Sequence, residues 1–393
     1  MPKNKILFFL ILSIYSFAQQ SAINKALVVG ANQTEKYVYK LNNKSIGIVA
    51  NQTSVILNED GSYSHLIDSL LKLKINIKRV FAPEHGFRGD ADAGEYVKNG
   101  SDKKTGLPII SLYGKNKKPA LNYLKDIDIM IFDIQDVGVR FYTYISTLHY
   151  IMEACAEQKI PLIILDRPNP NGDYIDGPVL DMKYKSFVGM HPVPIVHGMT
   201  VGEYAKMING ESWLSDELHC DLTVIKVTNY SHSTVYEPPI PPSPNLPNYK
   251  SIRLYPSLCL FEGTSISVGR GTDDQFQVYG SPELNPIIYK YQFKPLPNKG
   301  AKFPKYQNKL CFGENLKNSK INKGIQLNFI LKAYENSKNK SQFFNDFFIK
   351  LSGDNTLMNN IKIGFKELDI KKKWSKTIKS YSKMRQFYLL YPL

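Results

Sequence analysis

A short run of charged residues interrupted by glycines gives the first indication of chemistry in this chain. Residues 83–89 (PEHGFRG) bring Glu84, His85 and Arg88 together directly after an apolar run. A carboxyl group above an apolar floor tends to hold its proton, as a general acid must, so Glu84 is a candidate catalytic group. The alternative is a structural glutamate paired with Arg88. Because a proline and a phenylalanine enclose the motif, we favour a site in which His85 and Arg88 are substrate ligands.

A second group of polar residues follows the most apolar run of the chain, residues 127–134. We expect Asp136 and Arg140 to hold hydroxyl or acid groups of a ligand, since arginine suits bidentate recognition of carboxylates. Tyr142 and Tyr144 offer the aromatic faces and hydroxyls that sugar sites use, with ordinary core packing as an equal alternative.

Two further loops supply the remaining candidates. Asp166 follows another apolar run and is a candidate second carboxylate, with Asn169 nearby as a substrate ligand. Glu262 and Arg270 come much later in the chain, and Glu262 could stand across a cleft from Glu84 if the two parts face each other. Two carboxylates that flank a cleft, with arginine, asparagine and tyrosine around them, fit glycoside hydrolysis.

Short apolar runs that alternate with helix-like segments must position these residues. The candidate strands are residues 46–50, 75–81, 108–112, 127–134, 161–165 and 193–196, and the candidate helices are residues 64–73, 120–125 and 144–157. This alternation favours a mainly parallel sheet covered by helices on both faces. A polar loop follows each of the first five strands, beginning with Asn51. Because ligands of such sheets bind beyond the carboxyl ends of the strands, we expect these loops to form one site, with Asn51 as a ligand.

The character of the chain changes after residue 198. Thr200 and Glu203 have the spacing of a capping box and predict a helix over residues 200–209. The proline-rich residues 238–247 must be extended, either as a linker or as an ordered wall of a cleft. Further strands are expected at residues 221–227 and 324–331, and further helices at residues 341–351 and 381–391. We therefore divide the chain into an α/β domain over residues 22–198 and a smaller mixed α/β domain over residues 199–393.

The N-terminal residues have the composition of a secretory signal peptide. Two lysines precede the apolar residues 6–17, and Ser16-Phe17-Ala18 supplies a cleavage site, which predicts removal of residues 1–18. No other stretch approaches the ~18 apolar residues that a membrane span needs. We expect an exported protein, periplasmic or secreted.

Composition agrees with a large, folded, basic protein. The 393 residues allow two domains, and 43% hydrophobic residues with 25 tyrosines and 20 phenylalanines support a sizeable core. The formal charge of +15 becomes +13 (15 − 2) once Lys3 and Lys5 leave with the signal peptide. A basic exported protein favours anionic envelope polymers over nucleic acid as partners.

Several common site types are absent from the sequence. It contains no G-x-G-x-x-G after the first strand, no G-x-x-x-x-G-K-[ST], no H-E-x-x-H and no G-x-S-x-G. His85, His191 and His197 match no common zinc spacing, and the four cysteines form no C-x-x-C pair. Cys155 and Cys259 lie in apolar surroundings and are expected to be buried free thiols. We therefore expect neither a metal nor another cofactor.

Taken in order, the polar motifs resemble those of the exo-β-N-acetylmuramidases of the NamZ type, from about Leu41 to the end of the chain. The matching motifs are residues 47–53 (GIVANQT), 83–89 (PEHGFRG), 132–144 (FDIQDVGVRFYTY), 165–170 (LDRPNP), 241–247 (PPSPNLP), 261–264 (FEGT), 269–272 (GRGT) and 385–391 (RQFYLLY). The resemblance implies a Rossmann-like domain joined to a smaller C-terminal domain, with the site in the cleft between them. It also implies release of N-acetylmuramic acid from the non-reducing end of peptidoglycan, with Glu84 as the catalytic glutamate.

The lactyl carboxylate of N-acetylmuramic acid would give Arg88, Arg140 or Arg270 a natural partner. Two rival functions remain at this point: a non-catalytic envelope protein that binds muropeptides, and a hydrolase of another amino sugar or of an acyl bond. The stereochemical course also stays open, because carboxyl separations of ~5–5.5 Å and ~6.5–9.5 Å distinguish retention from inversion, and the substrate's own acetamido group offers a third route.

Overall fold

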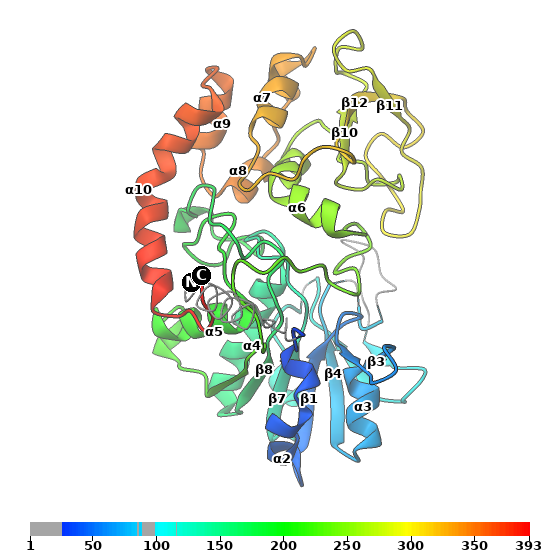
Figure 1. The fold of residues 1–393 in the computed structure, drawn as a ribbon, viewed down its shortest axis with the longest axis vertical. Helices are drawn as coiled ribbons and strands as arrows, with labels where there is room; N and C mark the ends of the chain where they lie inside the picture. The colour runs from blue at the N-terminus through cyan, green and yellow to red at the C-terminus, as the bar shows by residue number, and fades with distance from the viewer. Residues whose placement is uncertain (1–25, 85, 89–98, 115) are drawn as a thin grey trace, which may run out of the picture.

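The fold is a large parallel sheet joined to a smaller C-terminal unit, as Figure 1 shows. The structure is a computed structural model that describes residues 26–84, 86–88, 99–114 and 116–393. The predicted signal peptide and His85 lie outside the described residues. We call residues 26–248 the sheet domain and residues 249–393 the C-terminal domain.

The sheet domain is built on a seven-stranded sheet with the order β5-β6-β4-β1-β7-β8-β9. These strands are β1 (Ser45–Ala50), β4 (Asn76–Ala82), β5 (Gly100–Ser101), β6 (Pro108–Ser111), β7 (Ile129–Asp133), β8 (Leu162–Leu165) and β9 (Leu222–Ile225). All neighbouring pairs are parallel except β5 with β6, which is antiparallel. The prediction of a mainly parallel sheet is therefore confirmed.

Helices cover both faces of this sheet because its central strands are apolar on both sides. In β7, Ile129 and Ile131 join one hydrophobic core, while Met130 and Phe132 join the other. The remaining elements of this domain are α2 (Val38–Leu41), β2 (Val55–Leu57), β3 (Tyr63–His65), α3 (Leu66–Lys72), α4 (Tyr144–Gln158) and α5 (Val201–Gly210). The predicted capping box of Thr200 and Glu203 is present at the start of α5.

Two predicted elements of the sheet domain differ from the structure. Residues 193–196 do not form a ladder strand; Val196 makes only isolated bridges, to Val139 and Asp176. Residues 120–125 contain a short 3₁₀ helix, Leu121–Tyr123, in place of an α-helix. Moreover, β9 completes the large sheet, so the boundary that we placed after residue 198 falls inside the segment that builds this sheet.

The C-terminal domain consists of helices around a three-stranded antiparallel sheet with the order β10-β12-β11. Its elements are α6 (Tyr249–Leu258), β10 (Val278–Ser281), β11 (Tyr291–Phe293), β12 (Cys311–Asn315), α7 (Asn328–Glu335), α8 (Phe347–Ser352), α9 (Thr356–Lys362) and α10 (Glu367–Gln386). The strand predicted over residues 324–331 is wrong. Ile325 and Leu327 do alternate, but Ile330 and Ala333 continue at helical spacing and are buried in α7.

The proline-rich segment is an ordered wall between the two domains. The Gln52 side-chain amide donates to the carbonyl oxygens of Pro241 and Pro242, and the Tyr142 hydroxyl donates to Pro242 at 2.8 Å. Asn245 donates from Nδ2 to the Gly300 carbonyl at 2.8 Å. These contacts at both ends decide between the two alternatives for residues 238–247 in favour of a wall.

Helix α10 runs along one side of the molecule and brings the end of the chain back to the sheet domain (Figure 1). It covers residues 367–386, so the helix predicted over residues 381–391 ends earlier than expected. The Tyr381 hydroxyl donates to the His197 carbonyl at 2.8 Å, and the Tyr391 hydroxyl donates to Asp166 at 2.6 Å. The C-terminal residues thus join the two domains by hydrogen bonds, as the proline-rich wall does.

All four cysteines are free and buried, as expected for Cys155 and Cys259. Within the part of the chain that the structure describes, no helix is long and apolar enough to cross a membrane. Within the same residues, no cluster of three histidine, cysteine or acidic side chains could hold a metal ion.

Candidate active site

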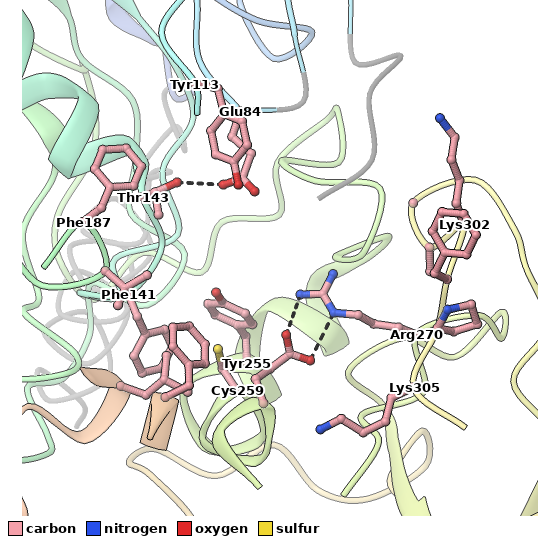
Figure 2. A pocket seen from close by; sticks show the side chains of 18 residues that line it. Glu84, Tyr113, Phe141, Thr143, Phe187, Tyr255, Cys259, Arg270, Lys302 and Lys305 are labelled. Carbon is pink, nitrogen blue, oxygen red and sulfur yellow. Dashed lines mark hydrogen bonds and ion pairs between the residues drawn. The ribbon is translucent and has the colours of Figure 1, made fainter. Parts of the chain in front are cut away.

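A cavity of about 930 Å³ lies between the sheet domain and the C-terminal domain (Figure 2). The sheet domain lines it with Glu84, Tyr113, Phe141, Thr143, Phe187 and Val188, and the C-terminal domain with Tyr255, Cys259, Glu262, Arg270, Phe347, Leu351 and residues 300–305. The cavity lies beyond the carboxyl ends of β4, β6 and β7, where the parallel sheet predicts a ligand site.

Glu84 stands on a tight turn directly after β4. The Gly86 amide donates to the Pro83 carbonyl at 3.0 Å, and Gly86 has a φ of +75°, a conformation that favours glycine. The turn stops the strand and presents the next side chain, Glu84, to the cavity. In the E-H-G motif, the glycine allows the positive φ of the turn, and the glutamate supplies a carboxyl group to the cavity.

Two hydroxyl groups surround the carboxyl group of Glu84 (Figure 2). Thr143, the residue that precedes α4, donates from Oγ1 to Glu84 Oε2 at 3.0 Å. Tyr113, from the loop after β6, lies next to Glu84 in the same view. Burial and then the Glu84 carboxylate raise the pKa of the Tyr113 hydroxyl, so that it stays protonated and able to donate. These contacts fix the orientation of Glu84.

Glu262 and Arg270 form an ion pair on the opposite side of the cavity (Figure 2). The Nε and Nη2 atoms of Arg270 donate to the two carboxylate oxygens of Glu262, each at 3.1 Å. About a quarter of each side chain is exposed, 27% for Glu262 and 24% for Arg270, so both can meet a ligand. Burial alone would lower the pKa of Arg270, but the Glu262 carboxylate raises it above its usual value.

Two lysines add positive charge to the same side of the cavity. Lys305 donates from Nζ to the carbonyls of Thr264 at 2.7 Å and Ile266 at 3.2 Å, and Lys302 lies on the same loop. Among the described residues that line the cavity, the cationic side chains are Arg270, Lys302 and Lys305, and the carboxylates are Glu84 and Glu262. The cavity as a whole suits a ligand that carries a negative charge.

A smaller cavity of about 60 Å³ opens beside the main one and shares Glu84, Phe141, Thr143, Tyr255 and Arg270 with it. Tyr142 and Tyr144 form part of its wall, with ring centroids 4.8 Å apart in an edge-to-face contact. Both hydroxyls lie within hydrogen-bond distance of the Pro242 carbonyl. The two tyrosines predicted as sugar-site residues thus border the site, although they are mostly buried.

The structure does not bring Asp166 into either cavity. Its side chain is completely buried and accepts hydrogen bonds from the Thr200 hydroxyl at 2.7 Å, the Gly202 amide at 2.9 Å and the Tyr391 hydroxyl at 2.6 Å. These partners hold the start of α5 and the end of the chain. The geometry therefore gives Asp166 a structural task and leaves Glu262 as the second carboxylate of the main cavity.

Arg140 also lines neither cavity. It is completely buried, and its two terminal nitrogens donate to four backbone carbonyls, those of Pro178, Val193, Leu351 and Ser352, at 2.7–2.9 Å. Because these carbonyls come from both domains, Arg140 joins the domains behind the cavity. The prediction that Arg140 binds a ligand is therefore wrong. The motif alone does not show that backbone carbonyls from both domains surround this side chain.

The other predicted ligands shape the loops around the cavity. Arg88 pairs with Asp102 at 2.8 Å and Asp68 at 3.5 Å, outside the main cavity. Asn51 and Asn169 are buried; Asn51 donates to the Tyr144 hydroxyl at 2.9 Å, and Asn169 donates to the Met199 carbonyl at 2.8 Å. The fourth of these residues, Asp136, accepts from the Gly138 amide at 2.6 Å in the turn after β7.

Sequence reasoning missed several residues that line the cavity. Thr143 lies between Tyr142 and Tyr144, which were both predicted as ligands. The sequence does not show that its hydroxyl reaches Glu84. Lys302 and Lys305 resemble ordinary surface lysines in sequence. Only the fold, which lays residues 300–305 against the cavity, distinguishes them from the other lysines of a basic chain.

Comparisons with known proteins agree along almost the whole chain. The family model "Exo-beta-N-acetylmuramidase NamZ, N-terminal" matches residues 46–250, and its C-terminal counterpart matches residues 253–391. A relative from Bacillus subtilis, named peptidoglycan beta-N-acetylmuramidase NamZ, is 38% identical over 376 residues, covering 90% of this chain and 89% of the relative.

Two crystal structures of DUF1343 family proteins from Bacteroides fragilis share the fold. One is 48% identical with a TM-score of 0.86, and the other is 29% identical with a TM-score of 0.77. Each match covers 93% of this chain and 99% of the solved one. The combination of sheet domain and C-terminal domain is thus common to all three proteins.

Proposed function

This chain belongs to the exo-β-N-acetylmuramidase NamZ family of glycoside hydrolases, and from this premise we propose that it releases N-acetylmuramic acid from the non-reducing end of peptidoglycan chains or fragments. One observation carries the proposal. The cavity between the domains holds an oriented glutamate on one side and a partly exposed arginine on the other.

Glu84 is the proposed general acid and base. In the first step the C1–O bond of the glycoside breaks, and its electron pair stays on the leaving oxygen, which takes the proton of the Glu84 carboxyl group while C1 becomes oxocarbenium-like. In the step that completes hydrolysis, a water molecule adds to C1 and its proton returns to the carboxylate. The hydroxyls of Thr143 and Tyr113 hold the carboxyl group in place during both transfers.

Arg270 is the proposed partner of the lactyl carboxylate. This group distinguishes N-acetylmuramic acid from N-acetylglucosamine, and arginine binds carboxylates well. Glu262 orients the guanidinium through its two hydrogen bonds, and Lys305 adds charge nearby. The same side of the cavity therefore accounts for a preference for a muramic residue at the chain end.

We also propose that the protein is exported, since residues 1–18 have the charge, the apolar run and the cleavage site of a signal peptide. Intact-mass measurement of the protein recovered from its own cell envelope tests this point. A mass that begins at residue 19 supports export, and a mass that includes Met1 contradicts it.

The activity is tested with chromogenic β-glycosides of N-acetylmuramic acid and N-acetylglucosamine. We expect turnover of the first and little of the second, and Arg270→Met should lower kcat/KM for the muramic substrate far more than for the other. Equal cleavage of both sugars would point to a hydrolase of another amino sugar. Binding of muropeptides without cleavage would point to an envelope binder.

A further inference from the structure

The small cavity beside Glu84 contains a buried oxygen atom without a partner. Asn245, in the proline-rich wall, is 1% exposed and lines this cavity. Its Nδ2 atom donates to the Gly300 carbonyl at 2.8 Å, which fixes the direction of the amide group. Its Oδ1 atom is buried and has no hydrogen-bond partner among the described residues. Because buried polar atoms are almost always hydrogen-bonded, an unpartnered oxygen on a residue that lines a cavity can accept from a ligand that donates.

The dimensions of this cavity limit the ligand to a small group. A volume of about 60 Å³ holds about four to six water-sized groups at roughly 10–15 Å³ each. Its lining mixes polar side chains, among them Glu84, Ser243 and Arg270, with the apolar surface of Leu246, Phe276 and the Tyr255 ring, and Asn245 gives it an acceptor. A group with about four heavy atoms, one N–H donor and one apolar end matches both properties.

The position of this cavity connects it to the proposed reaction. It shares Glu84 and Arg270 with the main cavity, so a sugar bound between these two residues can turn one substituent into it. An acetamido group has four heavy atoms, one N–H and one methyl group. On the proposed substrate, this group is attached to C2, the carbon next to the reacting C1.

We propose that the small cavity receives the 2-acetamido group of the muramic residue and that Asn245 Oδ1 accepts its N–H. The inference rests on the proposed function for the identity of the sugar. It makes Asn245 a specificity-determining residue that selects N-acetylated muramic acid against the de-N-acetylated form. The apolar walls then surround the methyl group, and longer N-acyl chains do not fit.

Binding measured by calorimetry tests the proposal without requiring catalysis. Free N-acetylmuramic acid and free muramic acid are titrated into wild type, Asn245→Ala and Asn245→Asp. Wild type should bind the N-acetylated sugar at least tenfold more tightly, and Asn245→Ala should lose most of this preference. Asn245→Asp offers a carboxylate to the ammonium group of muramic acid, so it should move the preference further toward the free amine.

Asn298→Ala is the matched control. Asn298 also donates from Nδ2 to a backbone carbonyl, that of Thr272 at 3.1 Å, and its Oδ1 is also buried without a partner among the described residues. It lines neither cavity. Asn298→Ala should keep the preference of wild type for the N-acetylated sugar. If Asn245→Ala acted only by losing the Asn245–Gly300 hydrogen bond, it would weaken the binding of both sugars by the same factor.

The outcomes separate the inference from the proposed function. An unchanged preference in both Asn245 variants, or equal binding of the two sugars by wild type, overturns the inference even if wild type cleaves the muramic glycoside. Absence of any hydrolysis overturns the proposed function, and the binding preference is still measured. Tight binding of an N-butanoyl muramic acid would contradict the size limit.

Discussion

The proposed proton transfer depends on how the carboxyl group of Glu84 is held. Its turn presents the carboxyl group, and the Thr143 hydroxyl at 3.0 Å fixes one of the two oxygens. Hydrogen bonds to charged groups contribute more than neutral ones. The rate of the proposed proton transfer should therefore depend on a residue that never touches the reacting bond.

Replacement of Thr143 by valine keeps the shape of the side chain and removes its hydroxyl. We expect kcat to fall by about 10- to 100-fold, which corresponds to about 1.5–3 kcal/mol, with KM little changed because the sugar contacts remain. Thr147→Val, one turn further along α4, is the control, since its hydroxyl donates to the Thr143 carbonyl at 3.4 Å and Thr147 lines neither cavity. Equal losses in the two variants, or a loss confined to KM, would contradict the positioning role.

Residue types and motif order predicted part of this site. Glu84, Glu262 and Arg270 all reach the main cavity, and Tyr142 and Tyr144 border the smaller one. Asp166 and Arg140 look equally suitable in sequence but are completely buried. Asp166 accepts from the Gly202 amide of α5, and Arg140 donates to the Leu351 carbonyl of α8. Which charged side chain points into a cavity depends on packing between distant segments, and a local motif does not contain that information.

At the scale of elements, the turn after β7 combines tight packing with a buried acid. Gly138 has a φ of +75°, and a side chain there would overlap Asn169. Asp136 caps this turn by accepting from the Gly138 amide. Burial raises the pKa of Asp136 to about 7, although the backbone amides of Gly138 and Val137 act in the opposite direction.

The raised pKa of Asp136 makes a prediction about stability and pH. The folded state holds this proton up to about pH 7, whereas an unfolded aspartate releases it near pH 4, so the contribution of Asp136 to stability falls as pH rises between these values. Asp136→Asn cannot titrate. Its free energy of unfolding relative to wild type should therefore increase from pH 4 to pH 7 and stay constant above.

Urea unfolding of both proteins at several pH values measures this difference. The same substitution at the exposed Asp128, just before β7, is the control for removing a carboxylate from this part of the chain. A difference that shrinks as pH rises from 4 to 7 would show that the sign of the effect is wrong.

Element by element, the buried strands were the easiest to predict. Apolar runs identified β1, β6, β7 and β8 to within about two residues, because strands covered on both faces contain few polar residues. The strand β4 was identified from Ile75, Ile77, Val80 and Phe81, although it also contains Asn76, Lys78 and Arg79. The apolar residues before α7 were misread as a strand, since two alternating positions cannot be distinguished from the start of a helix by periodicity alone. The prolines predicted extended chain over residues 238–247. They did not predict its contacts with Gln52, Tyr142 and Gly300, which are distant in sequence.

At the scale of the whole molecule, the end of the chain fastens the C-terminal domain to the sheet domain. The Tyr391 hydroxyl donates to the buried Asp166 and accepts from the Val227 amide at 2.9 Å. The Tyr388 hydroxyl, by contrast, donates to the partly exposed Glu211 at 2.6 Å. Sequence indicated a familial motif at residues 385–391, but only the fold shows its distant partners.

This pair of tyrosines allows a matched test of the fastening. Tyr391→Phe should lower the free energy of unfolding by about 1–3 kcal/mol, because it removes one of the two hydroxyl donors to a buried Asp166 oxygen and takes away the hydroxyl acceptor of the Val227 amide. Tyr388→Phe should lower it by less than about 1 kcal/mol, since water can replace the lost contact. Chemical denaturation gives both values, and neither change should alter kcat because both residues lie outside the cavity. A larger loss for Tyr388→Phe would contradict the account.

A comparison of wild type with Glu84→Gln on two substrates tests whether Glu84 donates the proton. One is a disaccharide with a non-reducing N-acetylmuramic acid, whose sugar leaving group needs a proton. The other is an aryl glycoside, whose leaving group needs little help. Thermal unfolding first establishes that the variant is folded. A proton donor predicts that the variant loses about 10²–10⁴-fold on the disaccharide and clearly less on the aryl glycoside, with binding of the sugar retained. Activity of Glu84→Gln on the disaccharide within about tenfold of wild type would contradict the role of Glu84 as the general acid.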